Sequence, residues 1–186
     1  AGWMARSGLT ALATGHHADD QAETLIMRLN RGSGVAGLAG VRARGVVPGT
    51  DLALLRPLIG WRREELARIV EASGIEPAQD PSNDDPRYDR ARIREALKEA
   101  DWLDVQGVAA SAAFLAEAEG VMQWATQREW NEAVKVGEGE IVYTPAAPQP
   151  IRMRIVARAI GILGGEPRLS AVARLMQRLR NGKDAT

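Results

Sequence analysis

The densest group of chemically capable side chains is the run 15–24, which reads Gly-His-His-Ala-Asp-Asp-Gln-Ala-Glu-Thr. Asp20 and Glu23 are three residues apart and would share one face of a helix, with His16 just before them. Such a carboxylate pair could bind a cationic substrate, position Mg²⁺ or act as a general base. The structural alternative is helix capping by Asp19 or Asp20, which stabilises a helix by about 0.5–1 kcal/mol. We interpret Asp19 alone as a capping residue and the whole run as a site.

A second candidate is Arg31, which is followed by Gly32, Ser33 and Gly34. Small residues after a cation let backbone N–H groups approach an anion, and the guanidinium of Arg31 could pair with a phosphate. A plain helix C-cap and turn would explain Gly32 equally well.

A third candidate lies in the polar segment 80–94. Arg90 and Arg94 fall one turn apart on a predicted helix, where two stacked guanidiniums could hold a phosphate. The alternative is an exposed helix on which these arginines pair with Asp89 and Glu95 or face water.

Composition excludes several other chemistries. The 186 residues contain no Cys, so disulfides, zinc ribbons, iron–sulfur clusters and thiol nucleophiles are ruled out. The only two His residues, His16 and His17, are too few for a dinuclear metal hydrolase, and no Gly-x-Ser-x-Gly elbow is present. No residue is therefore assigned as a metal ligand. No apolar run approaches the roughly 20 residues of a membrane span, and we expect no membrane association and a soluble, cytoplasmic protein.

The formal net charge of zero argues against indiscriminate binding of nucleic acid by the whole chain. The charge is uneven, however, because residues 101–137 sum to −4 and residues 138–186 sum to +4. The basic end could meet a polyanion, and a solvated basic helix face explains it equally well.

The elements that must position these residues alternate between strand and helix in the first half of the chain. Residues 9–14 and 52–58 read as strands, the first of them buried, and helices are predicted from 19 to 31 and from 62 to 73. This order predicts an α/β layer with parallel strands, a partial Rossmann-like half domain. Further helices are predicted near 88–99, over 102–136 and over 151–180, with a strand at 140–144. We place the domain boundary near residue 100, which gives domains 1–100 and 101–186.

Taken in order, these segments resemble the tRNA(Ile)-lysidine synthetases, which belong to the PP-loop (N-type) ATP pyrophosphatases. The resemblance rests on the run 15–24, Arg31–Gly34 with Gly37 and Leu38, Arg56-Pro57-Leu58, Arg63–Leu66, Asp80–Asn83, and the pattern Tyr88-x-Arg90-x-Arg92-Ile93-Arg94. It is specific over residues 9–97. Beyond residue 100 it extends only to general helical character.

The resemblance implies an enzyme that uses ATP to adenylate the C2 carbonyl oxygen of the wobble cytidine of tRNA(Ile) with a CAU anticodon. Free L-lysine then displaces AMP and gives lysidine. It further implies ATP with Mg²⁺, allows a homodimer, and makes 101–186 a helical substrate- or tRNA-binding domain. The implied site residues are His16, Asp20 and Glu23 at the reaction centre, and Arg31, Gly32, Ser33, Gly34, Arg90, Arg92 and Arg94 for phosphate or substrate. Asp20 and Glu23 would bind the lysine ammonium.

Two departures from the family pattern matter. The phosphate-binding Ser-Gly-Gly-x-Asp-Ser loop and the sheet around it are absent from this sequence, and with them the backbone cradle that aligns pyrophosphate departure. Ala91 stands where the family usually has Asn, so a hydrogen bond available there is missing. We also expect Asp20 to be an exposed first-turn carboxylate whose replacement by Ala costs little folding stability.

Two other functions stay open at this point. A PP-loop tRNA thiolase or amidotransferase-like enzyme would share the fold, but such enzymes usually bring Cys pairs. A non-catalytic, helical tRNA-docking module with a vestigial sheet would agree with the missing loop and the basic end.

We predict that this 186-residue chain is inactive alone, because the loop that would hold the ATP phosphates is not part of it. The test is lysidine formation on cognate tRNA(Ile) by the purified polypeptide with ATP and lysine. Robust turnover without any added sequence would contradict the prediction.

Overall fold

The computed structural model describes residues 2–78, 87, 89–167 and 169–180, and it divides into two compact units. The first is Ala1–Glu119 and the second is Gly120–Thr186, so the division falls within the long helix α6 (Val105–Ala133). The boundary that we place near residue 100 stays a prediction.

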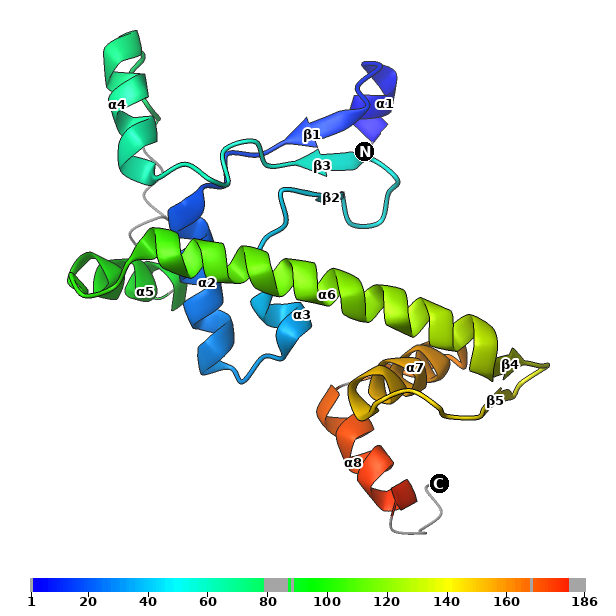
Figure 1. Ribbon diagram of the computed structural model, residues 1–186. Coiled ribbons are helices and arrows are strands. Elements are labelled where there is room, and N and C mark those ends of the chain that lie inside the picture. The colour runs from blue at the N-terminus through cyan, green and yellow to red at the C-terminus, as the bar shows by residue number, and fades with distance from the viewer. Residues whose placement is uncertain (1, 79–86, 88, 168, 181–186) are drawn as a thin grey trace. The chain divides into compact units, whose positions relative to one another are not determined.

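The first unit contains a three-stranded sheet with the order β1-β3-β2. The strands β1 (Ala11–Ala13) and β3 (Ala53–Leu55) pair in parallel, which confirms the predicted parallel layer, and both lead directly toward helices (Figure 1). The antiparallel strand β2 (Arg44–Val46) was not predicted from the sequence. The expected burial of the first strand is wrong, because Leu12 is 39% exposed. A sheet of three three-residue strands has little area with which to bury a side chain.

The predicted helices of the first unit are confirmed: α2 (Ala18–Asn30), α4 (Arg63–Ser73) and α5 (Asp89–Lys98). Two short helices, α1 (Gly2–Arg6) and α3 (Val35–Leu38), were not predicted. Four or five residues are too few to display a helical period. Helix α4 ends at Gly74, whose φ of 68° lies in the left-handed region that glycine favours.

Small residues bring α2 close to its neighbours. Helix α2 packs against α5, and Ala22 (0% exposed) and Ala91 (7%) are their buried alanines. The buried amide of Gln21 both donates to the carbonyl of Val41 and accepts from its N–H, each at 2.6 Å, which fixes the chain after α3. At Gly40 (φ 65°) a Cβ would lie 2.5 Å from Gln21 Oε1, so only glycine fits.

The second unit contains the rest of α6, the hairpin β4 (Val134–Val136) and β5 (Ile141–Tyr143), α7 (Gln149–Ile162) and α8 (Leu169–Arg180). Its core is Trp130, Ile151 and Ile155, with the guanidinium of Arg158 4.1 Å from the Trp130 ring centre. The mostly helical segment predicted over 102–136 contains α6, and its last three residues form β4, which pairs with β5. The mostly helical character predicted for this half is confirmed.

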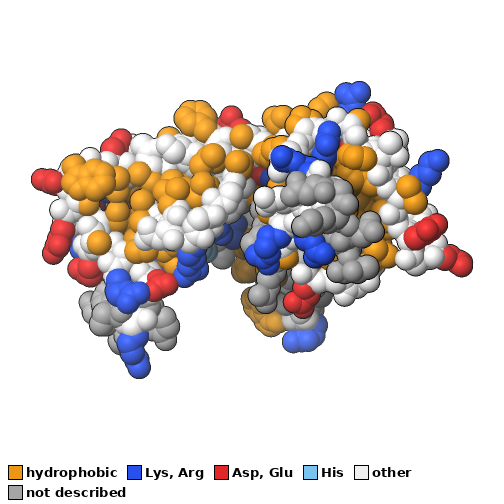
Figure 2. Space-filling view, turned by 90° about the horizontal axis from the view of Figure 1, so that it is seen from below, with side chains coloured by type: hydrophobic (Ala, Val, Ile, Leu, Met, Phe, Trp, Pro, Cys, Tyr) orange, Lys and Arg blue, Asp and Glu red, His pale blue; other side chains and the backbone are white. Residues whose placement is uncertain are grey.

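Apolar side chains reach the surface in many places, interspersed with charged ones (Figure 2). Trp102 is 79% exposed and Phe114 69%. Among the described helices, none combines the length and the apolar character needed to cross a membrane.

One buried carboxylate organises the second unit. Glu129 Oε1 accepts hydrogen bonds from the Tyr143 hydroxyl (2.8 Å) and from the backbone N–H groups of Ala146 (2.9 Å) and Ala147 (3.0 Å). These bonds, chiefly those from the two backbone N–H groups, hold the pKa of Glu129 below its ordinary value of 4.5. Glu129 thereby fixes the segment between β5 and α7.

We predict that Glu129→Gln lowers the melting temperature at neutral pH, because an amide replaces the ionised acceptor of three hydrogen bonds. The folded-state pKa is depressed, so the carboxylate stabilises the protein above its ordinary pKa and loses this effect as the pH falls through the folded value. In thermal unfolding the difference from wild type should therefore be constant from pH 7 to about 5 and shrink below about pH 4. Glu132→Gln, at an exposed residue of the same helix, is the control. A difference that does not change with pH would contradict this account.

Candidate active site

Helix α2 begins at the carboxyl end of β1, where open α/β sheets place their ligands. Its N-cap is His17, which corrects the prediction of Asp19 or Asp20. The His17 backbone N–H donates to Asp20 Oδ2 at 2.9 Å. Asp19 and Asp20 thus lie in the first turn, where the helix dipole favours negative charge.

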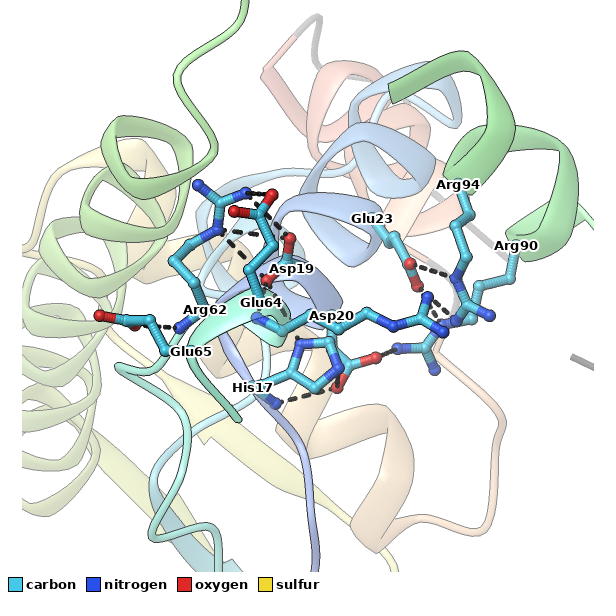
Figure 3. Close-up of polar contacts among 10 residues, drawn as sticks. His17, Asp19, Asp20, Glu23, Arg62, Glu64, Glu65, Arg90 and Arg94 are labelled. Carbon is cyan, nitrogen blue, oxygen red and sulfur yellow. Dashed lines mark hydrogen bonds and ion pairs between the residues drawn. The ribbon is translucent and has the colours of Figure 1, made fainter. Parts of the chain in front are cut away.

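Two carboxylates of α2 and two arginines of α5 form one cluster (Figure 3). Arg90 donates to Asp20 at 2.5 Å and to Glu23 at 2.6 Å. Arg94 donates to Glu23 at 2.7 Å, and a second contact measures 3.3 Å. The side chain of Glu23 is only 3% exposed and that of Asp20 13%. The four charges balance.

This pairing decides between the two interpretations of the arginines on α5. Arg90 and Arg94 pair with the carboxylates of α2, although the Arg90 side chain stays 39% exposed. A carboxylate as buried as Glu23 is strongly destabilising unless it is paired, and two guanidiniums supply that pairing. Asp20 is likewise not the exposed carboxylate that the sequence suggested, because α5 covers it. Its replacement by Ala therefore removes both an ion pair and the acceptor for His17.

Asp19 does not belong to this cluster and contacts the start of α4 instead. Its carboxylate accepts the backbone N–H of Arg63 at 2.8 Å and lies 3.2 Å from the guanidinium of Arg62. Partial burial alone would raise the pKa of Asp19, but these two partners outweigh burial and hold that pKa below its ordinary value. Asp19 therefore links the first turn of α2 to the start of α4, and sequence reasoning missed this partner.

His16 lies half-buried at the end of β1, with its Nδ1 2.9 Å from the Thr14 hydroxyl. Burial, followed by the nearby cations Arg56 and Arg90, lowers the pKa of His16 below 6.5, against the opposing effect of Asp20. The imidazole is therefore neutral at pH 7 and can accept a proton.

The other predicted residues lie apart from this cluster. Arg31 and Arg92 both pair with Asp89, at 2.8 and 2.5 Å, beside a hollow of about 310 Å³. Gly32 (φ 64°) ends α2, because its N–H and that of Ser33 donate to carbonyls of the last helical turn. This C-cap accounts for Gly32, and Gly34 is the N-cap of α3. Asp80–Asn83 and Tyr88 of the sequence pattern lie outside the described residues.

A hollow of about 530 Å³ in the first unit is lined by Glu23 and Arg94. Its other lining residues are Asp19 of α2, Arg62 at the N-cap of α4, Arg63 and Glu64 of α4, Leu97 and Lys98 of α5, Ala100, Asp101, Leu103 and Asp104 between α5 and α6, and Val105 of α6. In the described part of the chain, no group of three or more His, Cys, Asp or Glu side chains could hold a metal ion. Asp19, Asp20 and Glu23 are instead paired with arginines.

Comparison with known proteins identifies this fold. Residues 2–100, more than half of the chain, match the PP-loop domain. The chain belongs to the PP-loop family.

The curated relatives narrow the class further. The chain is 48% identical over 184 residues to the tRNA(Ile)-lysidine synthase of Novosphingobium aromaticivorans, covering 97% of this chain and 56% of the relative. It is 41% identical over 187 residues to that of Zymomonas mobilis, with the same coverages, and 37% identical over 192 residues to that of Ruegeria pomeroyi (98% and 45%). These relatives confirm the resemblance to tRNA(Ile)-lysidine synthetases. The chain spans about half the length of the curated relatives it matches.

We predict that Glu23→Gln destabilises the protein by about 3 kcal/mol, because it leaves two guanidiniums facing a buried neutral amide. Denaturant unfolding measures the change. Glu64→Gln, at a residue 73% exposed on α4, should change stability by less than about 0.5 kcal/mol. Equal midpoints for Glu23→Gln and wild type would show that the cluster does not hold α5 on α2.

Proposed function

We propose that this chain is part of a tRNA-modifying ligase that uses ATP to adenylate C2 of the wobble cytidine of tRNA(Ile) and then joins lysine to give lysidine. Three findings support this: the PP-loop match over residues 2–100, the printed names of the relatives, and the charged cluster beside His16. The observation that carries the proposal is the placement of Asp20, Glu23 and His16 together at the carboxyl end of β1.

The roles of the three residues differ. Glu23, buried between Arg90 and Arg94, acts as the anchor of the cluster, whereas the less buried Asp20 is the carboxylate that contacts the lysine ammonium once lysine is bound. An amine attacks only in its unprotonated form, so the site needs a proton acceptor, and neutral His16 suits that task. Asp20 then orients the amine and His16 receives its proton.

RNA contacts are assigned to arginines outside the cluster. Arg31 and Arg92 share the single carboxylate of Asp89, which leaves a net positive charge there for a phosphate. In the second unit, α7 and α8 pack together and contain six arginines without any acidic residue. Such a helix pair attracts the RNA backbone, so we assign tRNA docking to the helical half.

Magnesium enters this proposal with the substrate. Mg²⁺ at nucleotide sites is usually held by substrate phosphates together with one or two carboxylates. The described residues offer no cage of their own for it. Magnesium and a homodimer stay predictions.

We predict that Asp20→Asn in the natural full-length protein abolishes lysine transfer but leaves tRNA-dependent release of pyrophosphate from ATP. Asparagine can still accept the His17 N–H, so the change removes charge while keeping the cap. The measurements are pyrophosphate release and lysine incorporation into tRNA(Ile), the second over a range of lysine concentrations. Glu71→Gln, on the exposed surface of α4, is the matched control and should keep both activities. Lysine incorporation by Asp20→Asn at the wild-type rate would contradict the role given to Asp20.

A further inference from the structure

Arg56 directly follows β3 and lies next to the candidate site. The parallel register pairs Ala13 with Leu55, so Thr14 and Arg56 come next on their two strands, and the Thr14 N–H donates to the Leu55 carbonyl at 2.9 Å. Side chains one step beyond a parallel pair lie on the same face of the sheet. Thr14 in turn contacts His16 at 2.9 Å. The two strand ends thus place Arg56 and His16 on one side of the sheet.

The charge of Arg56 is not neutralised by a carboxylate among the described residues. Its Nη1 donates to the backbone carbonyl of Arg42 at 2.8 Å, and its Nε is buried without a hydrogen-bond partner in the part of the chain that the structure describes. Arg62, Arg90 and Arg94 differ, because each pairs with a carboxylate of α2. Arg56 is therefore a cation whose charge is not matched by a carboxylate of the described residues.

A purely structural role of Arg56 does not require a guanidinium with unused hydrogen-bond donors. One hydrogen bond to a backbone carbonyl uses one of the five N–H donors of a guanidinium, and an unsatisfied buried donor is costly. A planar cation with unused donors matches the oxygens of a phosphate.

We propose that Arg56, with His16 beside it, binds the phosphate group of the nucleotide at the carboxyl ends of β1 and β3. The identity of that nucleotide rests on the proposed function. In lysine transfer the amine nitrogen forms a bond to C2, the bond from C2 to the phosphorylated oxygen breaks, and AMP leaves with the electron pair. The surplus proton of the nitrogen passes to His16. Arg56 opposes the negative charge on the departing phosphate.

The test uses the 186-residue chain and the NMR signals of its two histidines. AMP and inorganic phosphate are titrated separately, with sodium chloride at equal ionic strength as the blank. In wild type both anions should shift the His16 signals and raise its pKa, because a nearby anion favours the imidazolium. Tighter binding of AMP than of phosphate would assign the site to a nucleotide, and equal binding would overturn that part of the proposal.

Two variants separate binding from folding. Arg56→Gln should weaken AMP binding at least tenfold, and Arg56→Lys, which keeps the charge but not the planar fork, by a smaller factor. Arg44→Gln, at an exposed arginine of β2, is the control and should bind as wild type does. No response of His16 to either anion in wild type, or undiminished binding in Arg56→Gln, would overturn the proposal.

A separate activity measurement distinguishes this inference from the proposed function. In the natural full-length protein, Arg56→Gln should lower kcat for lysine transfer more than it raises KM for lysine, because Arg56 acts on the leaving group. If anion binding depends on Arg56 but the full-length protein forms no lysidine, the phosphate site holds and the proposed function fails. A rise in KM alone would overturn the role at the leaving group.

Discussion

The buried carboxylate of Glu23 is the constraint on which the candidate site depends. A side chain 3% exposed cannot carry a charge in a protein interior unless cations reach it, and those cations come from α5, 67 and 71 residues further along the chain. The requirement fixes which face of α5 meets α2. It also fixes Asp20, because Arg90 holds both carboxylates. Folding stability and the geometry of the site therefore depend on the same three ion pairs.

The arginines near the candidate site are of two kinds. Arg90 and Arg94 pair with carboxylates and hold the site residues in position. The cluster therefore has no net charge with which to attract a ligand from a distance. Attraction must come from groups whose charge is not matched, and Arg56 at the end of β3 is such a group. Burial, helped by the neighbouring cations Arg56 and Arg90, lowers the pKa of His16. The strand ends thus combine a charge-balanced cluster with an unmatched cation.

Much of the fold could be predicted because its longer elements carry their own signals. The period of apolar residues gave α2, α4 and α5, and strand–helix alternation gave the parallel pairing of β1 with β3. The strand β2 has no such signal, since Arg44, Gly45 and Val46 do not alternate in polarity. For the site, the sequence indicated Asp20, Glu23, Arg90 and Arg94 separately. It could not show that they meet, because their pairing depends on the packing of two distant helices. The partner of Asp19 was missed for the same reason, as was the free charge of Arg56.

The arginines of the two compact units differ in how they are paired with carboxylates. This difference bears on how the proposed RNA substrate would bind. In the first unit most of the arginines near the site are held by carboxylates, which gives precise positions and little long-range field. In the second, α7 and α8 carry six arginines with no acidic residue on either helix, which gives a positive field. Binding of a polyanion needs the field, whereas transfer of an amine to one base needs fixed geometry. A substrate that is both long and anionic, such as a tRNA, needs both properties in one chain, and a small nucleotide alone would not need α7 and α8.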